Sequence, residues 1–139
     1  MTEPVALFDA TFVLDAEAVS ALVRRTPRLQ TVLAAALARR SHIVVPAVVL
    51  AEVMTGAPSD AAYWQALKRL AVVDTTARIA ARAGALREAA LAARRQKRDL
   101  TVDAIVAATA AEHTPAIVVT GDPADLKLLA GPGVKIVSV

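Results

Sequence analysis

Four carboxylic acids lie beside strongly apolar segments of this chain, and their type and placement could support chemistry. Each one follows or opens such a segment; the four are Asp15, Glu52, Asp103 and Asp122. Carboxylates resist burial unless they are paired or bound to a metal ion. Four of them at the ends of core elements therefore predict one acidic pocket that binds divalent cations.

An acidic pocket of this kind could hydrolyse phosphodiester bonds. Mg²⁺ and Mn²⁺ prefer hard oxygen ligands, keep several waters and also bind substrate phosphates. Such ions lower the pKa of a bound water, orient it for in-line attack and stabilise charge on the leaving oxygen. No histidine base is needed for this reaction. Without metal, clustered carboxylates would repel and raise one another's pKa.

Each acid also has a purely structural interpretation. Asp15 could begin a turn, and Asp103 could stand at the start of a helix because the helix dipole favours an acid there. Asp122 could cap the helix that opens at Pro123. Glu52 is harder to explain in this way, because the segment around it is apolar. The set of four is much more specific than any single member.

Hydrophobic periodicity and the positions of proline and glycine predict alternating strands and helices. Short apolar runs predict strands over 5–14, 42–45, 71–73, 116–120 and 134–139. Helices are expected over 17–25, 27–40, 47–54, 60–70, 77–97, from 101 onward, and over 122–130. Thr101 is expected to cap the helix that carries Asp103. Leu37 and Trp64 are expected on the apolar faces of their helices.

This alternation predicts a three-layer α/β/α sandwich around a central, mostly parallel sheet. We expect residues 1–139 to form a single domain, because a chain of this length suits one core. Parallel sheets of this kind place ligands at the carboxyl ends of their strands. Asp15 ends the first predicted strand and Asp122 lies just beyond the fourth. Two of the four acids therefore fall at the edge where a site is expected.

Composition excludes several other classes of protein. The chain has 139 residues, of which 56% are hydrophobic and only 3% aromatic, which favours a compact, helix-rich body over disorder. It has no cysteine, so disulfides, thiolate catalysis and cysteine-bound zinc are excluded. The sequence contains neither a signal-peptide pattern nor an uncharged apolar stretch long enough to span a membrane. We expect a cytoplasmic protein that does not bind membranes.

The segments around the four acids resemble the motifs of the PIN-domain ribonucleases, and in particular the toxin subunit of VapBC toxin–antitoxin modules. An apolar strand ends at Asp15, a second motif runs from Val45 to Glu52, a helix begins near Asp103, and a fourth motif surrounds Asp122. Each motif alone is loose, but four in order at suitable separations are a strong signal. The resemblance covers nearly the whole chain.

The resemblance implies a metal site and roles for individual residues. It implies that Asp15, Glu52, Asp103 and Asp122 are catalytic and bind Mg²⁺ or Mn²⁺, with Asp15 and Asp103 as the principal ligands. Thr120 would place a hydroxyl at a strand end, where it orients a water or a carboxylate. Asp125 is a further acid in the same loop, and we expect it to contact the metal ligands rather than the metal itself.

Two features of the opening motif need attention. The segment from Leu7 to Leu14 also resembles a family opening, with Asp9 as the metal ligand. Asp15 is preferred because a helix-like segment follows it directly and its separation from Glu52 suits the family better. Position 17 is Glu, where many members carry a small polar residue or Asn. Glu17 could add to the acidic pocket or face solvent at a helix start.

The leading hypothesis is a metal-dependent endoribonuclease that acts as a toxin and is held inactive by a cognate antitoxin. By resemblance alone, a homodimer is also expected. The apolar helical segments 31–38 and 61–70 could receive a partner helix or could simply be core. The alternative hypothesis is a non-catalytic domain of the same architecture that binds metal or RNA.

The net charge of +3 and the isoelectric point near 9.8 are too mild to prove nucleic-acid binding. Arginines cluster at Arg24, Arg25 and Arg28, and the densest basic run lies at 94–98. That run could be a solvated helix end or could contact phosphates. We predict that RNA phosphates are bound there by Arg94, Arg95, Lys97 and Arg98.

Two other classes of α/β protein with acidic edges fit poorly. A phosphorylated receiver domain needs adjacent acids after the first strand and a Lys after a late strand, and no such Lys stands beside Thr120. A phosphatase of the haloacid dehalogenase type needs Asp-x-Asp after the first strand, whereas Asp15-Ala16-Glu17 matches that pattern badly.

Overall fold

A computed structural model describes residues 10–94 and 99–139. The strands are β1 (Thr11–Leu14), β2 (His42–Pro46), β3 (Ala71–Val73), β4 (Ala116–Thr120) and β5 (Val134–Ser138). The helices are α2 (Ala16–Arg24), α3 (Pro27–Ala38), α4 (Val48–Val53), α5 (Asp60–Leu67), α6 (Ala77–Arg94), α7 (Thr101–Ala111) and α8 (Pro123–Leu129). Strands and helices alternate in the order that the hydrophobic pattern predicts.

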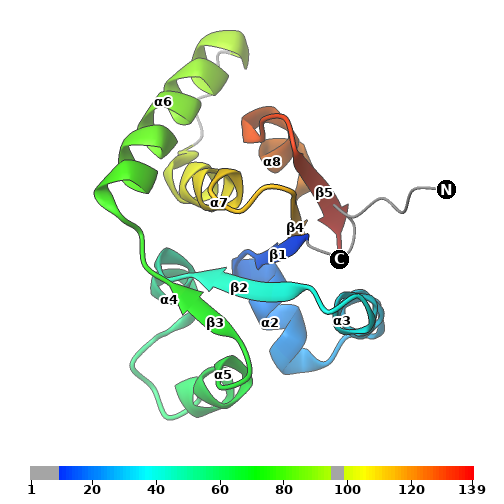
Figure 1. The fold of residues 1–139 in the computed structure, drawn as a ribbon. Coiled ribbons are helices and arrows are strands. Elements are labelled where there is room, and N and C mark those ends of the chain that lie inside the picture. The colour runs from blue at the N-terminus through cyan, green and yellow to red at the C-terminus, as the bar shows by residue number, and fades with distance from the viewer. Residues whose placement is uncertain (1–9, 95–98) are drawn as a thin grey trace, which may run out of the picture.

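The five strands form one sheet in the order β3-β2-β1-β4-β5, and every pairing is parallel. Helices cover both faces of this sheet (Figure 1). The predicted α/β/α sandwich is therefore confirmed. In the view of Figure 1, α2, α3 and α5 lie below the sheet, and α7 and α8 lie above it with α6 outside α7.

The two central strands, β1 and β4, are buried along their whole length, and their apolar runs explain why. The chain leaves β1 toward β2 on one side and leaves β4 toward β5 on the other. Successive strands are therefore added in opposite directions from β1 and from β4, so the topological switch point of the sheet lies between these two strands. A crevice outside the carboxyl ends of two such strands is where open α/β sheets bind ligands. Asp15 directly follows β1, and Asp122 lies two residues after β4.

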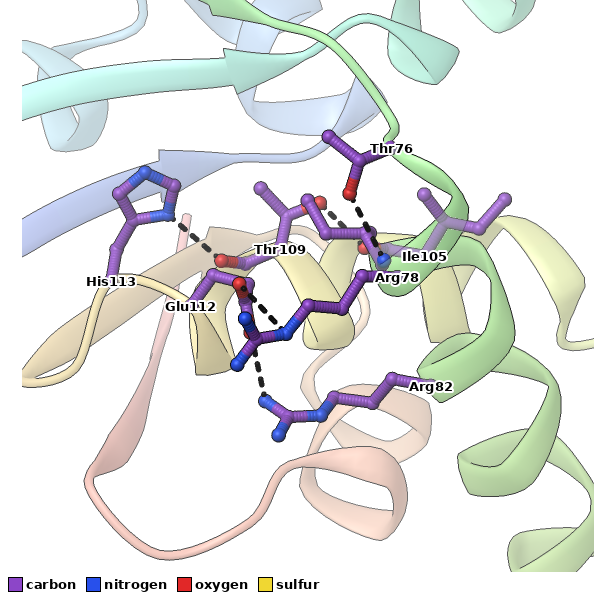
Figure 2. A network of polar contacts seen from close by, with 8 residues as sticks. Thr76, Arg78, Arg82, Ile105, Thr109, Glu112 and His113 are labelled. Carbon is purple, nitrogen blue, oxygen red and sulfur yellow. Dashed lines mark hydrogen bonds and ion pairs between the residues drawn. The ribbon is translucent and has the colours of Figure 1, made fainter.

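The helix that carries Asp103 is held by polar contacts at its other end (Figure 2). Glu112 follows α7 and pairs with two arginines of α6, at 3.6 Å from Arg78 Nε and 3.3 Å from Arg82 Nη1. The backbone N–H of Ile79 donates to the hydroxyl of Thr76, which caps the start of α6. These contacts hold α6 along α7 and so help to fix the direction in which α7 presents Asp103.

Four local predictions were wrong. Leu37 is 68% exposed and Trp64 is 54% exposed, so neither lies on the buried face of its helix. Thr101 does not cap α7; it is the first helical residue, and its N–H donates to the carboxylate of Asp99. The helix expected to reach residue 70 ends at Leu67. Among the described residues, no helix is both long enough and apolar enough to cross a membrane.

Candidate active site

The four acids singled out by the sequence line one pocket of about 280 Å³ at the carboxyl edge of the sheet. They reach it from four separate parts of the fold: the ends of β1 and β4, and the helices α4 and α7. Eight of the described residues line it, and six of these are carboxylic acids: Asp15, Glu17, Glu52, Asp99, Asp103 and Asp122. Among the described residues, no lysine or arginine lines this acid pocket.

Asp15 is the most enclosed member of the acid pocket, with 6% of its surface exposed. It caps α2, and its Oδ1 accepts a hydrogen bond of 2.9 Å from the N–H of Ala18. Burial raises the pKa of Asp15, although hydrogen bonds from Thr120 and Ala18 partly oppose this effect. Asp15 therefore caps a helix rather than beginning a turn, and this structural role does not account for the neighbouring acids.

Thr120 connects two of the acidic segments. Its side chain is fully buried at the end of β4, where its hydroxyl hydrogen-bonds to Asp15 and accepts a 2.9 Å bond from the N–H of Asp122. Because the oxygen accepts from Asp122, the hydroxyl proton is available to the carboxylate of Asp15. Thr120 therefore orients Asp15 and fixes the backbone that carries Asp122.

Asp103 carries the largest shift in the pocket. Its pKa is raised to about 6, first by burial and then, in decreasing order, by the negative charges of Asp125, Asp15, Glu52 and Asp122. Asp125 is itself buried, with 5% exposure, in the first turn of α8. It lies close enough to act on Asp103 but does not line the pocket. The predicted role of Asp125 in support of metal ligands stays a prediction.

Glu52 lies at the exposed side of the pocket. The sequence places it within an apolar helix, but the carboxylate of this α4 residue faces outward while Val49 and Val53 are buried. Partial burial and the charge of Glu17 still raise its pKa. Glu52 is therefore positioned to meet a substrate or ion that enters from solvent.

Glu17 and Asp99 also line the pocket; the sequence left the role of Glu17 open and did not identify Asp99. The carboxylate of Glu17 packs so closely on Gly121 that a Cβ atom at position 121 would overlap it. Glu17 therefore joins the acidic pocket, one of the two possibilities left open above. Asp99 follows a dense basic run in the sequence, and for this reason it was not identified as a candidate for the acidic pocket. Its hydrogen bonds from Thr101 lower its pKa.

Asp122 occupies the cap position of α8, as its structural interpretation proposed, but its side chain makes no capping hydrogen bond. Two expectations cannot be compared with the fold. Asp9 lies outside the described residues, and so does the basic run, except that the backbone of Arg94 ends α6. The assignment of RNA contacts to that run stays a prediction.

The donors in the pocket suit hard divalent cations, because they are all carboxylates and because the charges of neighbouring acids help to raise the pKa values of Asp15, Glu52 and Asp103. Within the described part of the chain, no three acidic or histidine side chains are close enough to hold one ion by themselves. Mg²⁺ fits such a pocket, since it is usually held by one or two carboxylates together with waters and substrate phosphate.

The wider comparisons agree with this fold. The structure of VapBC2 from Rickettsia felis, bound to a DNA fragment from its promoter, is 20% identical, with a TM-score of 0.69 over 92% of this chain and 98% of that chain. DNA-bound VapBC from Salmonella typhimurium is also 20% identical, with a TM-score of 0.66 over 93% and 98% of the two chains.

A toxin–antitoxin complex from Klebsiella pneumoniae is 25% identical, with a TM-score of 0.64 over 91% of this chain and 95% of that chain. A search of curated proteins finds no match. The sequence model described as the PIN domain matches residues 12–131, which include all four acids. By its sequence and its fold, the chain belongs to the PIN-domain family.

Proposed function

We propose that this protein is a metal-dependent endoribonuclease and the toxin of a toxin–antitoxin pair. The observation that carries the proposal is the acid pocket, in which carboxylates from four separate segments meet at the topological switch point between β1 and β4. An all-oxygen, strongly negative site has no evident use without cations, because its charges oppose one another. Membership of the PIN-domain family supports a nuclease.

The residues of this chain would hold and orient the reacting groups. Asp15 and Asp103 are the principal candidates for Mg²⁺ or Mn²⁺ ligands, because they are the more enclosed acids and carry raised pKa values. Glu52 and Asp122 would complete the donor set from the other two segments. When bound, the ions would supply a more acidic water and would stabilise charge on the leaving oxygen.

Thr120 and Asp125 would act on the ligands rather than on RNA. The hydroxyl of Thr120 restricts the rotation of Asp15, and the charge of Asp125 increases the tendency of Asp103 to keep a proton when no cation is present. Cation binding therefore has to displace that proton, so affinity should increase as the pH rises.

The proposed partners rest on the solved relatives. Several similar structures are two-component toxin–antitoxin complexes, including those named VapBC and FitAB. We extend this to the present chain and propose a cognate antitoxin that blocks the acid pocket. A homodimer remains part of the proposal through the family resemblance.

Cleavage of labelled single-stranded RNA of mixed sequence tests the proposal. The purified chain should cleave it with Mg²⁺ or Mn²⁺ and stop when a chelator is added. Asp15→Asn and Asp103→Asn should each reduce the rate by at least about a hundredfold, the scale expected when a main electrostatic contribution is removed. Glu88→Gln is the matched control, because this exposed acid of α6 forms its ion pair with Arg87 away from the pocket.

Two results would contradict the nuclease. Cleavage that survives both pocket substitutions would indicate a contaminating enzyme. A folded chain that binds metal or RNA but does not cleave would favour the alternative, a non-catalytic PIN-like domain. Melting temperatures of the variants separate loss of chemistry from loss of fold.

A further inference from the structure

The acid pocket has an electrostatic difficulty with its proposed substrate. A phosphodiester carries a negative charge, and six carboxylic acids surround the place where it would have to bind. Divalent cations would neutralise part of that charge, but the flanking phosphates of an RNA strand would still enter a negative field. A cation supplied by the protein near the pocket would therefore have a clear use.

A second pocket adjoins the acid pocket and supplies such a cation. This side pocket has a volume of about 410 Å³ and shares Ala16, Glu17 and Glu52 with the acid pocket. Beyond the shared wall it is lined by Ser20, Arg24, Val53 and Tyr63. The two pockets therefore form one continuous depression, acidic at one end and carrying an arginine and an aromatic ring at the other.

The side pocket is built by the packing of α2 against α4 and α5. Residues 16, 20 and 24 lie at helical spacing and so share one face of α2. On the facing helix α5, the hydroxyl of Tyr63 lies 3.2 Å from the hydroxyl of Ser20, which fixes the position of the half-buried ring. Arg24 is exposed at the end of α2, and among the described residues no carboxylate forms an ion pair with it.

We propose that the side pocket binds the nucleotide next to the scissile bond in single-stranded RNA. The ring of Tyr63 stacks on the base, and the guanidinium of Arg24 binds the adjoining phosphate. Single-stranded RNA is recognised in this way, by stacking of unpaired bases on aromatic rings and by arginine contacts. This proposal rests on the proposed nuclease function, since it assigns the neighbouring position on the same strand.

Binding, rather than cleavage, tests this assignment independently of catalysis. The parent is the wild-type chain with Ca²⁺ in place of Mg²⁺, because Ca²⁺ is also a hard cation with oxygen ligands. The probe is fluorescently labelled single-stranded RNA of mixed sequence, titrated at several salt concentrations and checked to remain intact. Loss of one phosphate contact lowers the slope of log affinity against log salt by about 0.7 for a single strand. Arg24→Gln should produce that change. Arg39→Gln should not, because this exposed arginine follows α3 and lies near the start of β2, at the opposite edge of the sheet.

Tyr63 has a different signature, because stacking does not depend on counterions. Tyr63→Leu should weaken binding about tenfold, within the range of one stacked base, and leave the salt slope unchanged. Tyr63→Phe keeps the ring and should bind within about twofold of the parent, a loss far smaller than that of a stacked base. If Tyr63→Leu unfolds, the Phe variant and Arg24→Gln still decide the matter.

Each outcome separates this assignment from the proposed function. Equal affinity and slope in the parent, Arg24→Gln and Tyr63→Leu chains would overturn it, even if the wild-type chain cleaves RNA. Failure of the parent to bind the RNA would also overturn it. Conversely, a wild-type chain that does not cleave, while the variants lose affinity as described, would refute the nuclease and leave the nucleotide pocket in place.

Discussion

The two ends of α7 each carry a carboxylate, and the charges that surround these two carboxylates are of opposite sign. Glu112, just beyond the end of the helix, lies between Arg78 and Arg82 (Figure 2). Asp103, in the first turn, lies among other acids and has its pKa raised to about 6. The helix dipole would favour the reverse, because an acid is stabilised at the N-terminal end and destabilised at the C-terminal end.

Under the proposed function, this difference separates structural acids from acids that bind a metal ion. The fold compensates Glu112 with two cations of its own, although the dipole works against it. Among the described residues, no lysine or arginine pairs with Asp103, although the helix dipole alone would favour an isolated acid at that end. The charged form of Asp103 is therefore disfavoured by its burial in the pocket together with the neighbouring acids. A cation bound from solution would remove this unfavourable energy. The predictions below test this contrast, from the largest expected effect to the smallest.

Addition of Mg²⁺ or Mn²⁺ should stabilise the wild-type chain. A ligand that binds only the folded state at one hundred times its Kd adds about 2.7 kcal/mol to the free energy of unfolding. Thermal melting with and without the ion measures this effect, and Asp103→Asn should remove most of the stabilisation. If the ion raises the melting temperature of Glu112→Gln as much as that of the wild type, the ion acts at the N-terminal end of α7. A similar increase in Asp103→Asn would contradict the assignment.

In a metal-free solution at pH 8, Asp103→Asn should stabilise the chain by up to about 2 kcal/mol. The physical reason is that a shift of one pKa unit corresponds to about 1.4 kcal/mol, and the substitution removes a charge that burial and neighbouring acids disfavour. Denaturant unfolding in the presence of a chelator measures this. A loss of stability would show that Asp103 is compensated in the folded state.

The gain from Asp103→Asn should depend on pH. In the folded chain Asp103 keeps its proton up to a pH of about 6, whereas the ordinary pKa of an aspartic acid in an unfolded chain is 3.8. Between these values the folded state holds more protons, so the stability of the wild type falls as the pH rises from about 4 to about 6 and then levels off. The advantage of the variant should therefore be absent near pH 4 and complete above about 7. A constant difference across this range would contradict the shift.

Glu112→Gln should destabilise the chain by less than about 1 kcal/mol. Its ion pairs are partly exposed, and pairs of this kind contribute about 0–1 kcal/mol, while removal of an acid at a helix C-terminus recovers part of the loss. A double-mutant cycle with Arg82→Gln isolates the pair. Stabilisation by Glu112→Gln would mean that the dipole outweighs both arginines, and the contrast between the two ends would then weaken.

The sequence predicted the fold and the convergence of the four acids for a physical reason. Apolar runs such as 12–14 and 116–120 must be buried, and parallel strands bring their carboxyl ends to the same edge. Asp15 and Asp122 were therefore placed by topology alone. Glu52 and Asp103 needed the family resemblance, because nothing in a helical pattern specifies how far a helix leans over a sheet.

The remaining features depend on packing that periodicity does not encode. Helical spacing alone could not show that Trp64 lies outside the contact between α5 and α2 while Tyr63 lies within it. Asp99 lies in the pocket because of the turn before α7, and its basic neighbours gave no sign of this. The error at Leu37 has the same origin, since α3 packs mainly through Leu29 and Ala36.

The hydroxyl of Thr120 has a consequence for how substitutions in this chain should be judged. Valine would have nearly the same shape at that buried position, so the core would remain filled and a search for cavities would detect nothing. Yet the swap would leave the amide of Asp122 without its acceptor and release the rotation of Asp15. One oxygen atom therefore sets the geometry of two chain segments, and a variant with a fully packed core would still lose the alignment of its site.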